Sequence, residues 1–322
     1  MRNGNEIVEE IKKLHQLLSK DITKQTENQT IDKLSSVAHS GKGDLVYNIE
    51  KNSDNIIDGH LPKFAEKFGP ALLISESIGE KIYGAKNKEE CAYAIIIDPL
   101  DGTRELMYDL RSAWILTGVA PNKPEPKLKD IEIAVQTEIP TTKQFRYDVF
   151  SANGNKTIAE RHDKLHGNSF EWKPQPSRTK TIEGGFAFLT KFFEGAKTKS
   201  SEIEEELFKR LGLMEEGKAK TFDDQYICSA GQFAMLFSGS YRFCGDLRPY
   251  LTKTLSAHPY DVCTKPIADN LGIEITDVYG NNLDVPLDTK TGVSWFGYAN
   301  KDIRNQVEPV LLEILEEKVP NY

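Results

Sequence analysis

Hydrophobic residues recur every three or four positions in several stretches of the chain. This spacing is typical of amphipathic helices that bury one face. It predicts helices at Asn5–Lys20, from Ile57 to Phe68, at Ser200–Leu213, Ala230–Phe237, Tyr260–Gly272 and Asp302–Lys318. The polar stretch Asp21–Ser40 between the first two is predicted to be a connection.

Short apolar runs between these stretches predict strands. They are Ala71–Ser75, Cys91–Ile97, Ser112–Ala120, Asp130–Thr137, Ile273–Val278 and Val293–Ala299. Residues 153–182 are polar and contain Pro174 and Pro176, so they are predicted to form a long loop or a divider between two halves. We therefore expect an α+β half over residues 1–177 and an α/β half over residues 178–322.

Charge and composition exclude several classes of protein. The 322 residues include 41 Lys and Arg and 49 Asp and Glu, a net charge of −8 without any basic block, which argues against nucleic-acid binding. The longest apolar run, Cys91–Ile97, is too short to cross a membrane, and the first residues lack the apolar stretch of a signal peptide. Without a signal peptide or a membrane span, we expect a cytoplasmic protein whose four cysteines are reduced. These cysteines form no C-x-x-C pair, so we do not expect a structural zinc site.

The strongest chemical signal is Asp98-Pro99-Leu100-Asp101-Gly102-Thr103, directly after an apolar run. Pro99 is expected to force a turn that brings the two carboxylates together. Such a pair stays ionised only if a cation neutralises it, and hard oxygen donors suit Mg²⁺ or Mn²⁺. The amides of Gly102 and Thr103 could bind a phosphate if they begin a helix. From composition alone, an acidic turn after a strand is an equally good interpretation.

This segment resembles the D-P-[I/L]-D-G-T signature of the inositol monophosphatase family, whose members are Mg²⁺-dependent, lithium-sensitive phosphatases. Three weaker elements are similar to the family in order and spacing: Gly43–Val46 with Glu50, Ile74–Glu76, and Tyr260–Cys263. The resemblance implies a layered αβαβα sandwich of the inositol monophosphatase and fructose-1,6-bisphosphatase type. It also implies two or three Mg²⁺ ions for each site, with Mn²⁺ possible, and a homodimer.

Residue by residue, the resemblance implies roles at the matching positions. Metal ions would be bound by Glu76, Asp98, the Leu100 carbonyl, Asp101 and Asp261, with Glu50, and Asp44 beside it, near a weaker third ion. The catalytic residues would be Glu76, Asp98 and Thr103, with Glu76 and the Thr103 hydroxyl orienting water. The amides of Gly102 and Thr103 would bind phosphate.

Several of these positions have a second interpretation. Asp261 could simply cap the helix that follows it, Glu50 could be a solvated acid at the start of a helix, and Asp44 could be a turn residue.

Candidate substrate residues are Arg104, Ser229, Ala230 and Lys253. Lys253, Arg248 and Arg242 could also meet a second phosphate, or they could be solvated surface charges. The Arg104-Glu105 pair resembles the subgroup that acts on 3′-phosphoadenosine 5′-phosphate, and fructose-1,6-bisphosphatase-like members are a third possibility.

The sequence therefore predicts a metal-dependent phosphomonoesterase. Its substrate would be a small phosphorylated metabolite such as an inositol phosphate, a sugar phosphate or 3′-phosphoadenosine 5′-phosphate. The alternative is a catalytically silent protein on the same fold that binds metal or phosphate, because a fold does not fix a function.

Overall fold

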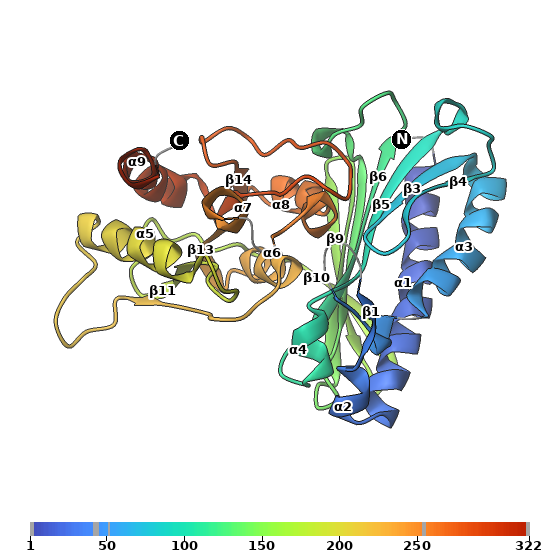
Figure 1. Ribbon diagram of the computed structural model, residues 1–322, viewed down its shortest axis with the longest axis horizontal. Helices are drawn as coiled ribbons and strands as arrows, with labels where there is room; N and C mark the ends of the chain where they lie inside the picture. The colour runs from blue at the N-terminus through green and yellow to red at the C-terminus, as the bar shows by residue number, and fades with distance from the viewer. Residues whose placement is uncertain (1–2, 41–44, 51, 253–255, 320–322) are drawn as a thin grey trace.

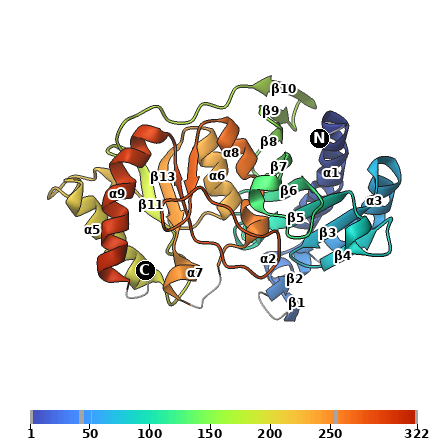
Figure 2. The same cartoon turned by 90° about the horizontal axis from the view of Figure 1, so that it is seen from above.

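The chain folds into five layers, alternately helical and β, as the computed structural model shows in Figures 1 and 2. The structure describes residues 3–40, 45–50, 52–252 and 256–319. Helices α1 (Gly4–Asn28) and α3 (Ser53–Phe68) cover the outer face of a large sheet. Helices α6 (Ser229–Phe237) and α8 (Lys265–Asn270) lie between this sheet and a smaller one, whose outer face is covered by α5 (Lys197–Arg210) and α9 (Lys301–Lys318). The predicted αβαβα sandwich is confirmed.

The large sheet has eight strands in the order β10-β9-β8-β7-β6-β5-β3-β4. Their bounds are β3 Ala71–Ser75, β4 Gly79–Tyr83, β5 Tyr93–Asp101, β6 Ala113–Pro121, β7 Ile133–Ile139, β8 Arg146–Asn153, β9 Lys156–Asp163 and β10 Asn168–Trp172. Neighbouring strands are antiparallel except β3 and β5, which are parallel. A separate hairpin pairs β1 (Val37–Ser40) with β2 (Leu45–Tyr47).

The smaller sheet has five strands in the order β12-β11-β13-β15-β14. Their bounds are β11 Gly185–Leu189, β12 Thr221–Phe222, β13 Tyr241–Asp246, β14 Glu274–Thr276 and β15 Trp295–Tyr298. The large sheet ends at Trp172 and the smaller one begins at Gly185. The predicted boundary between residues 177 and 178 lies in the connection between them.

Short helical segments complete the described structure. They are α2 Ile31–Leu34, α4 Thr103–Met107, α7 Arg248–Leu251, and the single 3₁₀ turns η1 Asn48–Glu50, η2 Lys88–Glu90, η3 Leu128–Asp130 and η4 Pro259–Val262. Among the described residues, no helix combines the length and the apolar composition needed to span a membrane. The four cysteines are buried and form no disulfide.

Strand β5 is buried on both faces of the large sheet. Ile95 and Ile97 pack in the core beneath α1 and α3, whereas Ile96 belongs to the core shared with α6 and α8. Because helices cover both faces of the sheet, the side chains on both sides of this strand are apolar. Its sequence is therefore a continuous apolar run and not an alternation of apolar and polar residues. The same burial fixes the position of the acidic segment at its end.

The first helix is longer than the sequence predicts, because α1 continues through residues expected to be a connection. Ile22 is fully buried four positions after Leu18, so the helical spacing continues. The Gln25 side chain donates hydrogen bonds to Asp21 and to the Ile49 carbonyl, so polar side chains support the extension.

The prediction of a loop over residues 153–182 is wrong for residues 156–172, which contain β9 and β10. Polar side chains pair across the strands here. Arg161 donates two hydrogen bonds of 2.7 Å to Asp148, and His162 stacks on Tyr147 at 4.8 Å. Because these cross-strand pairs replace apolar burial, the hydrophobic pattern gives no strand signal.

The predicted helix over Tyr260–Gly272 is divided into η4 and α8. Pro266 lies in the first turn of α8, where the missing N–H of proline is tolerated. The proline therefore begins a second helix, and Asp261 lies on the preceding 3₁₀ turn.

Candidate metal centre

The candidate site begins where β5 and β3 leave the large sheet. These two strands are parallel, and Ser75 lies opposite Ile97. Glu76 directly follows β3, and Asp98 follows Ile97 on β5. The two residues therefore lie next to each other at the carboxyl ends of these neighbouring strands. The negative charge of Glu76 is one cause of the raised pKa of Asp98, which is consistent with this proximity.

A β-bulge brings Asp101 to the same side as Asp98. The sequence predicted a turn at Pro99, but β5 continues to Asp101, with a register shift between Asp98 and Asp101. Residues an odd number of positions apart in a regular strand point to opposite faces, and one extra residue reverses this relation. The bulge therefore brings the two carboxylates together, which the sequence analysis expected of a turn at Pro99.

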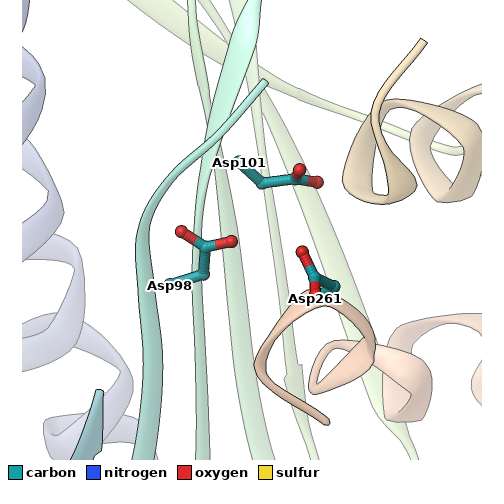
Figure 3. Close-up of side chains that lie close together, drawn as sticks. All are labelled: Asp98, Asp101 and Asp261. Atoms are coloured by element: carbon teal, nitrogen blue, oxygen red, sulfur yellow. The ribbon is translucent and has the colours of Figure 1, made fainter. Parts of the chain in front are cut away.

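The third carboxylate comes from the other half of the chain. Asp261 lies on η4, and ligand oxygens of Asp98, Asp101 and Asp261 all lie within 4.8 Å of one another. Figure 3 shows the three side chains converging between the end of β5 and this helical turn. A separation of this size allows one cation to contact all three.

Backbone amides hold each of the three carboxylates in place. Asp98 accepts a hydrogen bond of 2.9 Å from the Leu100 amide, and Asp101 accepts one of 2.6 Å from the Ala230 amide at the beginning of α6. Asp261 accepts one of 2.6 Å from the His258 amide. This bond belongs to the capping box of η4, in which His258 is the N-cap and Asp261 the third residue of the turn. The N-cap of the following helix α8 is Thr264, so the alternative that Asp261 caps that helix is wrong.

Burial raises the pKa values of all three groups, and repulsion by neighbouring carboxylates adds to this for Asp98 and Asp261. Burial is the largest cause for Asp98, and the charges of Glu76, Asp101 and Asp261 add to it. Burial raises the pKa of Asp101 to about 6 from 3.8, and burial and the charge of Asp101 raise that of Asp261. Three carboxyl groups with these shifts fit a divalent cation, which stabilises their ionised forms.

Glu50 lies beside Thr103 rather than on the surface. The Thr103 hydroxyl is 2.6 Å from Glu50 Oε1 and 2.8 Å from the Leu100 carbonyl oxygen, so its single proton has two acceptors. The other Glu50 oxygen accepts a hydrogen bond of 3.0 Å from the Tyr47 amide. Thr103 thus contacts the carboxylate of Glu50. The sequence assigned Glu76 to act with this hydroxyl, and that assignment stays a prediction.

Gly102 ends the bulge and begins α4, as the phosphate prediction required. It has a φ of +93°, a conformation that favours glycine. A Cβ atom there would lie 3.0 Å from both Cys228 Sγ and Glu105 Oε2. The positive φ and these contacts both favour glycine at this position. Phosphate binding by the Gly102 and Thr103 amides stays a prediction.

The predicted substrate residues are only partly near the cluster. The Ala230 amide is bound by Asp101, with Ser229 beside it, and Arg104 follows Thr103 on α4. Arg242 donates hydrogen bonds to the carbonyl groups of Thr181 and Glu183, which does not suit a second phosphate. Asp44 and Lys253 lie outside the described residues.

Two residues that the sequence analysis named have contacts that it did not predict. Glu105 is buried and accepts a hydrogen bond of 3.2 Å from the Cys228 amide, so it connects α4 to the beginning of α6. Arg248, for which the sequence allowed a second phosphate or a solvated surface position, is buried and paired with Asp246. Only its spacing of two residues from Asp246 could have indicated this ion pair.

Similar solved structures share this architecture. A fructose-1,6-bisphosphatase from Leishmania major has a TM-score of 0.69 at 12% identity, with 98% of this chain and 95% of that chain covered. The extragenic suppressor protein SuhB from Bartonella henselae has a TM-score of 0.65 at 16% identity, with 95% and 98% covered. An inositol monophosphatase (IMPase) from Thermotoga maritima has a TM-score of 0.59 at 17% identity, with 98% and 99% covered.

At the level of sequence, no protein-family profile and no curated protein matches the chain. The structural similarity covers nearly the whole length of both partners in each comparison, at identities of 12%, 16% and 17%. The layered fold is therefore the common feature, as the sequence resemblance predicted. The chain has the fold found in inositol monophosphatases and fructose-1,6-bisphosphatases.

Proposed function

We propose that the protein is a divalent-metal-dependent phosphomonoesterase of small phosphorylated metabolites. The observation that carries the proposal is the convergence of Asp98, Asp101 and Asp261 within 4.8 Å on a fold shared with phosphatases. Their pKa values are raised, so the cluster is unfavourable when ionised and unoccupied. A site of this kind is stabilised by binding a divalent cation.

The residues present fit Mg²⁺ or Mn²⁺, because every donor in the cluster is a hard carboxylate oxygen. Asp98, Asp101 and Asp261 would hold the cation, with Glu76 at the adjacent strand end. When bound, the metal would lower the pKa of an attacking water and neutralise the leaving oxygen.

Thr103 and Glu50 are proposed to position the attacking water. When the Thr103 hydroxyl donates its proton to Glu50, its lone pairs remain available to accept a hydrogen bond from water. The Glu50 carboxylate then receives a proton through this hydroxyl. The 2.6 Å separation of the two oxygens suits such a relay.

The test is phosphate release from inositol phosphate, fructose 1,6-bisphosphate and 3′-phosphoadenosine 5′-phosphate, with Mg²⁺ and with a chelator. We expect Mg²⁺-dependent release from at least one of them. Asp98→Asn should lower kcat/KM by at least about a hundredfold, because the metal contributes several kcal/mol to the transition state.

Asp302→Asn is the matched control, because Asp302 is exposed on α9, which covers the outer face of the smaller sheet. It should retain the wild-type kcat/KM. Absence of release from the whole panel, or full activity of Asp98→Asn, would contradict the proposal. Metal binding without turnover would instead favour a catalytically silent protein.

A further inference from the structure

The two residues proposed to position the attacking water come from elements that are far apart in the sequence. Thr103 begins α4, and Glu50 ends the single 3₁₀ turn η1, which directly follows β2. One Glu50 oxygen lies 2.6 Å from the Thr103 hydroxyl, and the other accepts a hydrogen bond of 3.0 Å from the Tyr47 amide. The orientation of this carboxylate therefore depends on the position of Tyr47.

A second contact joins the same two elements. The Arg104 Cζ atom lies 5.6 Å from the centre of the Tyr47 ring, within the range of a cation–π interaction. Tyr47 is otherwise buried, with 9% of its surface exposed. Thr103 thus contacts Glu50, and the next residue of α4 contacts Tyr47. Two adjacent residues of one helix hold both ends of the segment from Tyr47 to Glu50.

The other half of the molecule fixes the side chain of Arg104. Its Cζ atom lies 5.2 Å from the ring centre of Phe193, in the connection between β11 and α5. Phe193 itself packs edge-on against Tyr226, with the ring centres 6.3 Å apart. A long side chain that contacts two rings loses much of its rotamer freedom. Arg104 can therefore act as a rigid support for the Tyr47 ring.

We propose that Arg104 is a positioning residue for Glu50. It holds the Tyr47 ring, and the Tyr47 amide holds the Glu50 carboxylate beside the hydroxyl that it contacts. This inference rests on the proposed phosphatase function, and it assigns to that reaction a residue that acts through another residue.

The sequence suggested Arg104 as a substrate residue, and the two roles predict different kinetics. Loss of a substrate contact weakens ground-state binding and raises KM. A displaced Glu50 lowers kcat and leaves KM unchanged, because the contacts with the substrate remain.

The first test is a double-mutant cycle in steady-state kinetics with Mg²⁺ and the best substrate of the panel. Arg104→Gln should lower kcat by about tenfold and change KM by less than about twofold, since even small displacements of a catalytic group are costly. Glu50→Gln removes the carboxylate that Arg104 is proposed to position. In that background, Arg104→Gln should lower kcat by less than about twofold.

Substitutions of Tyr47 test whether its ring transmits the effect. Tyr47→Phe keeps the ring and should retain the wild-type kcat, whereas Tyr47→Leu should lower kcat as Arg104→Gln does. Arg111→Gln is the matched control, because Arg111 is exposed and also joins the two halves, through hydrogen bonds to Asp224. This control should retain the wild-type kcat.

Urea unfolding tests the connection without relying on turnover. Arg104→Gln and Glu50→Gln weaken the same connection between α4 and η1. Their combined effect on the midpoint of unfolding should therefore be smaller than the sum of their separate effects. This result in a protein that releases no phosphate from the panel would support the connection and contradict the proposed phosphatase function.

A raised KM with unchanged kcat in Arg104→Gln would overturn the inference in favour of a substrate contact. So would an equal decrease in kcat with and without the Glu50 carboxylate, or additive shifts of the unfolding midpoint. Equal decreases in Tyr47→Phe and Tyr47→Leu would also overturn it, because the ring would then not transmit the effect.

Discussion

At the scale of single residues, the main feature is a set of carboxyl groups whose ionisation opposes folding. The pKa of Asp101 is raised to about 6 from 3.8, and those of Asp98 and Asp261 are also raised. The folded protein therefore retains protons that the unfolded chain releases over this range of pH. A bound cation removes this difference, since it stabilises the ionised carboxylates.

This gives a prediction for stability. Without divalent ions, the free energy of unfolding should fall as the pH rises from 3.8 through about 6, by at most about 1.4 kcal/mol per pH unit for each such group. With Mg²⁺ the fall should be smaller and the protein more stable above pH 6. Urea unfolding with chelator and with Mg²⁺ across this range measures both curves.

Asp98→Asn serves as the comparison, because it removes one of the repelling charges. It should flatten the pH dependence measured in chelator and weaken the stabilisation by Mg²⁺. A constant difference between the chelator and Mg²⁺ curves at every pH would contradict the prediction.

At the scale of residues, the sequence predicted some members of the candidate site and missed others. The sequence predicted the acids from Asp98 to Asp101 because they are neighbours in one motif. It did not predict that Thr103 contacts Glu50 or that Arg248 is buried. Thr103 and Glu50 are far apart in the chain, so no local pattern specifies their contact. Asp246 lies only two residues from Arg248, but the burial of this ion pair depends on the tertiary fold.

At the scale of elements, the close approach of two connections depends on a glycine. Gly239 lies between α6 and β13 with a φ of +82°, and a Cβ there would lie 2.4 Å from the Gln175 carbonyl oxygen. Gln175 belongs to the segment that links the two sheets. The glycine thus allows this segment to pass against the end of α6.

Gly239→Ala should therefore be strongly destabilising. The positive φ costs about 1 kcal/mol and the backbone contact a further 1–3 kcal/mol or so. Gly272→Ala is the matched control, because Gly272 has a φ of +75° but no atom within 4 Å of a Cβ. In urea unfolding, Gly272→Ala should lower the free energy of unfolding only by the cost of the positive φ. Equal decreases in the two variants would show that the contact with Gln175 does not contribute to stability.

Elements with strong apolar periodicity were predicted well, and polar ones were not. The cores beneath α3 and around β5 follow the spacing of their buried side chains. Strands β9 and β10 were missed because ion pairs and stacking, rather than apolar alternation, hold them in the sheet. Pairing of this kind is visible only when the partner strand is in place.

At the scale of the whole molecule, a buried glutamine connects three elements. Gln136 on β7 is fully buried, and its Nε2 atom donates a hydrogen bond of 2.8 Å to the Ala230 carbonyl oxygen on α6. Its Oε1 atom accepts one of 2.8 Å from the hydroxyl of Thr264, which precedes α8. The large sheet is thereby joined to α6, whose Ala230 amide also binds Asp101, and to the residue that precedes α8.

Gln136→Leu should lower the free energy of unfolding by about 1–3 kcal/mol, since the Thr264 hydroxyl would remain buried without its acceptor. Gln16→Leu on the exposed face of α1 is the control. It should change the free energy of unfolding by less than about 0.5 kcal/mol. Thermal and urea unfolding give both values. A loss no larger than that of the control would mean that this connection does not stabilise the layers.

The sequence alone determined the local features of this protein. Side-chain spacing specified most helices and buried strands, and the motif from Asp98 to Thr103 indicated the candidate metal chemistry and the family resemblance. Spacing and motifs relate residues that are close in the sequence, so they can be recognised before the fold is known. Only the tertiary structure decided the distant contacts: the β3–β5 register beside Glu76, the approach of Asp261, and the contact of Thr103 with Glu50. These depend on strand pairing and layer packing, which no local pattern specifies.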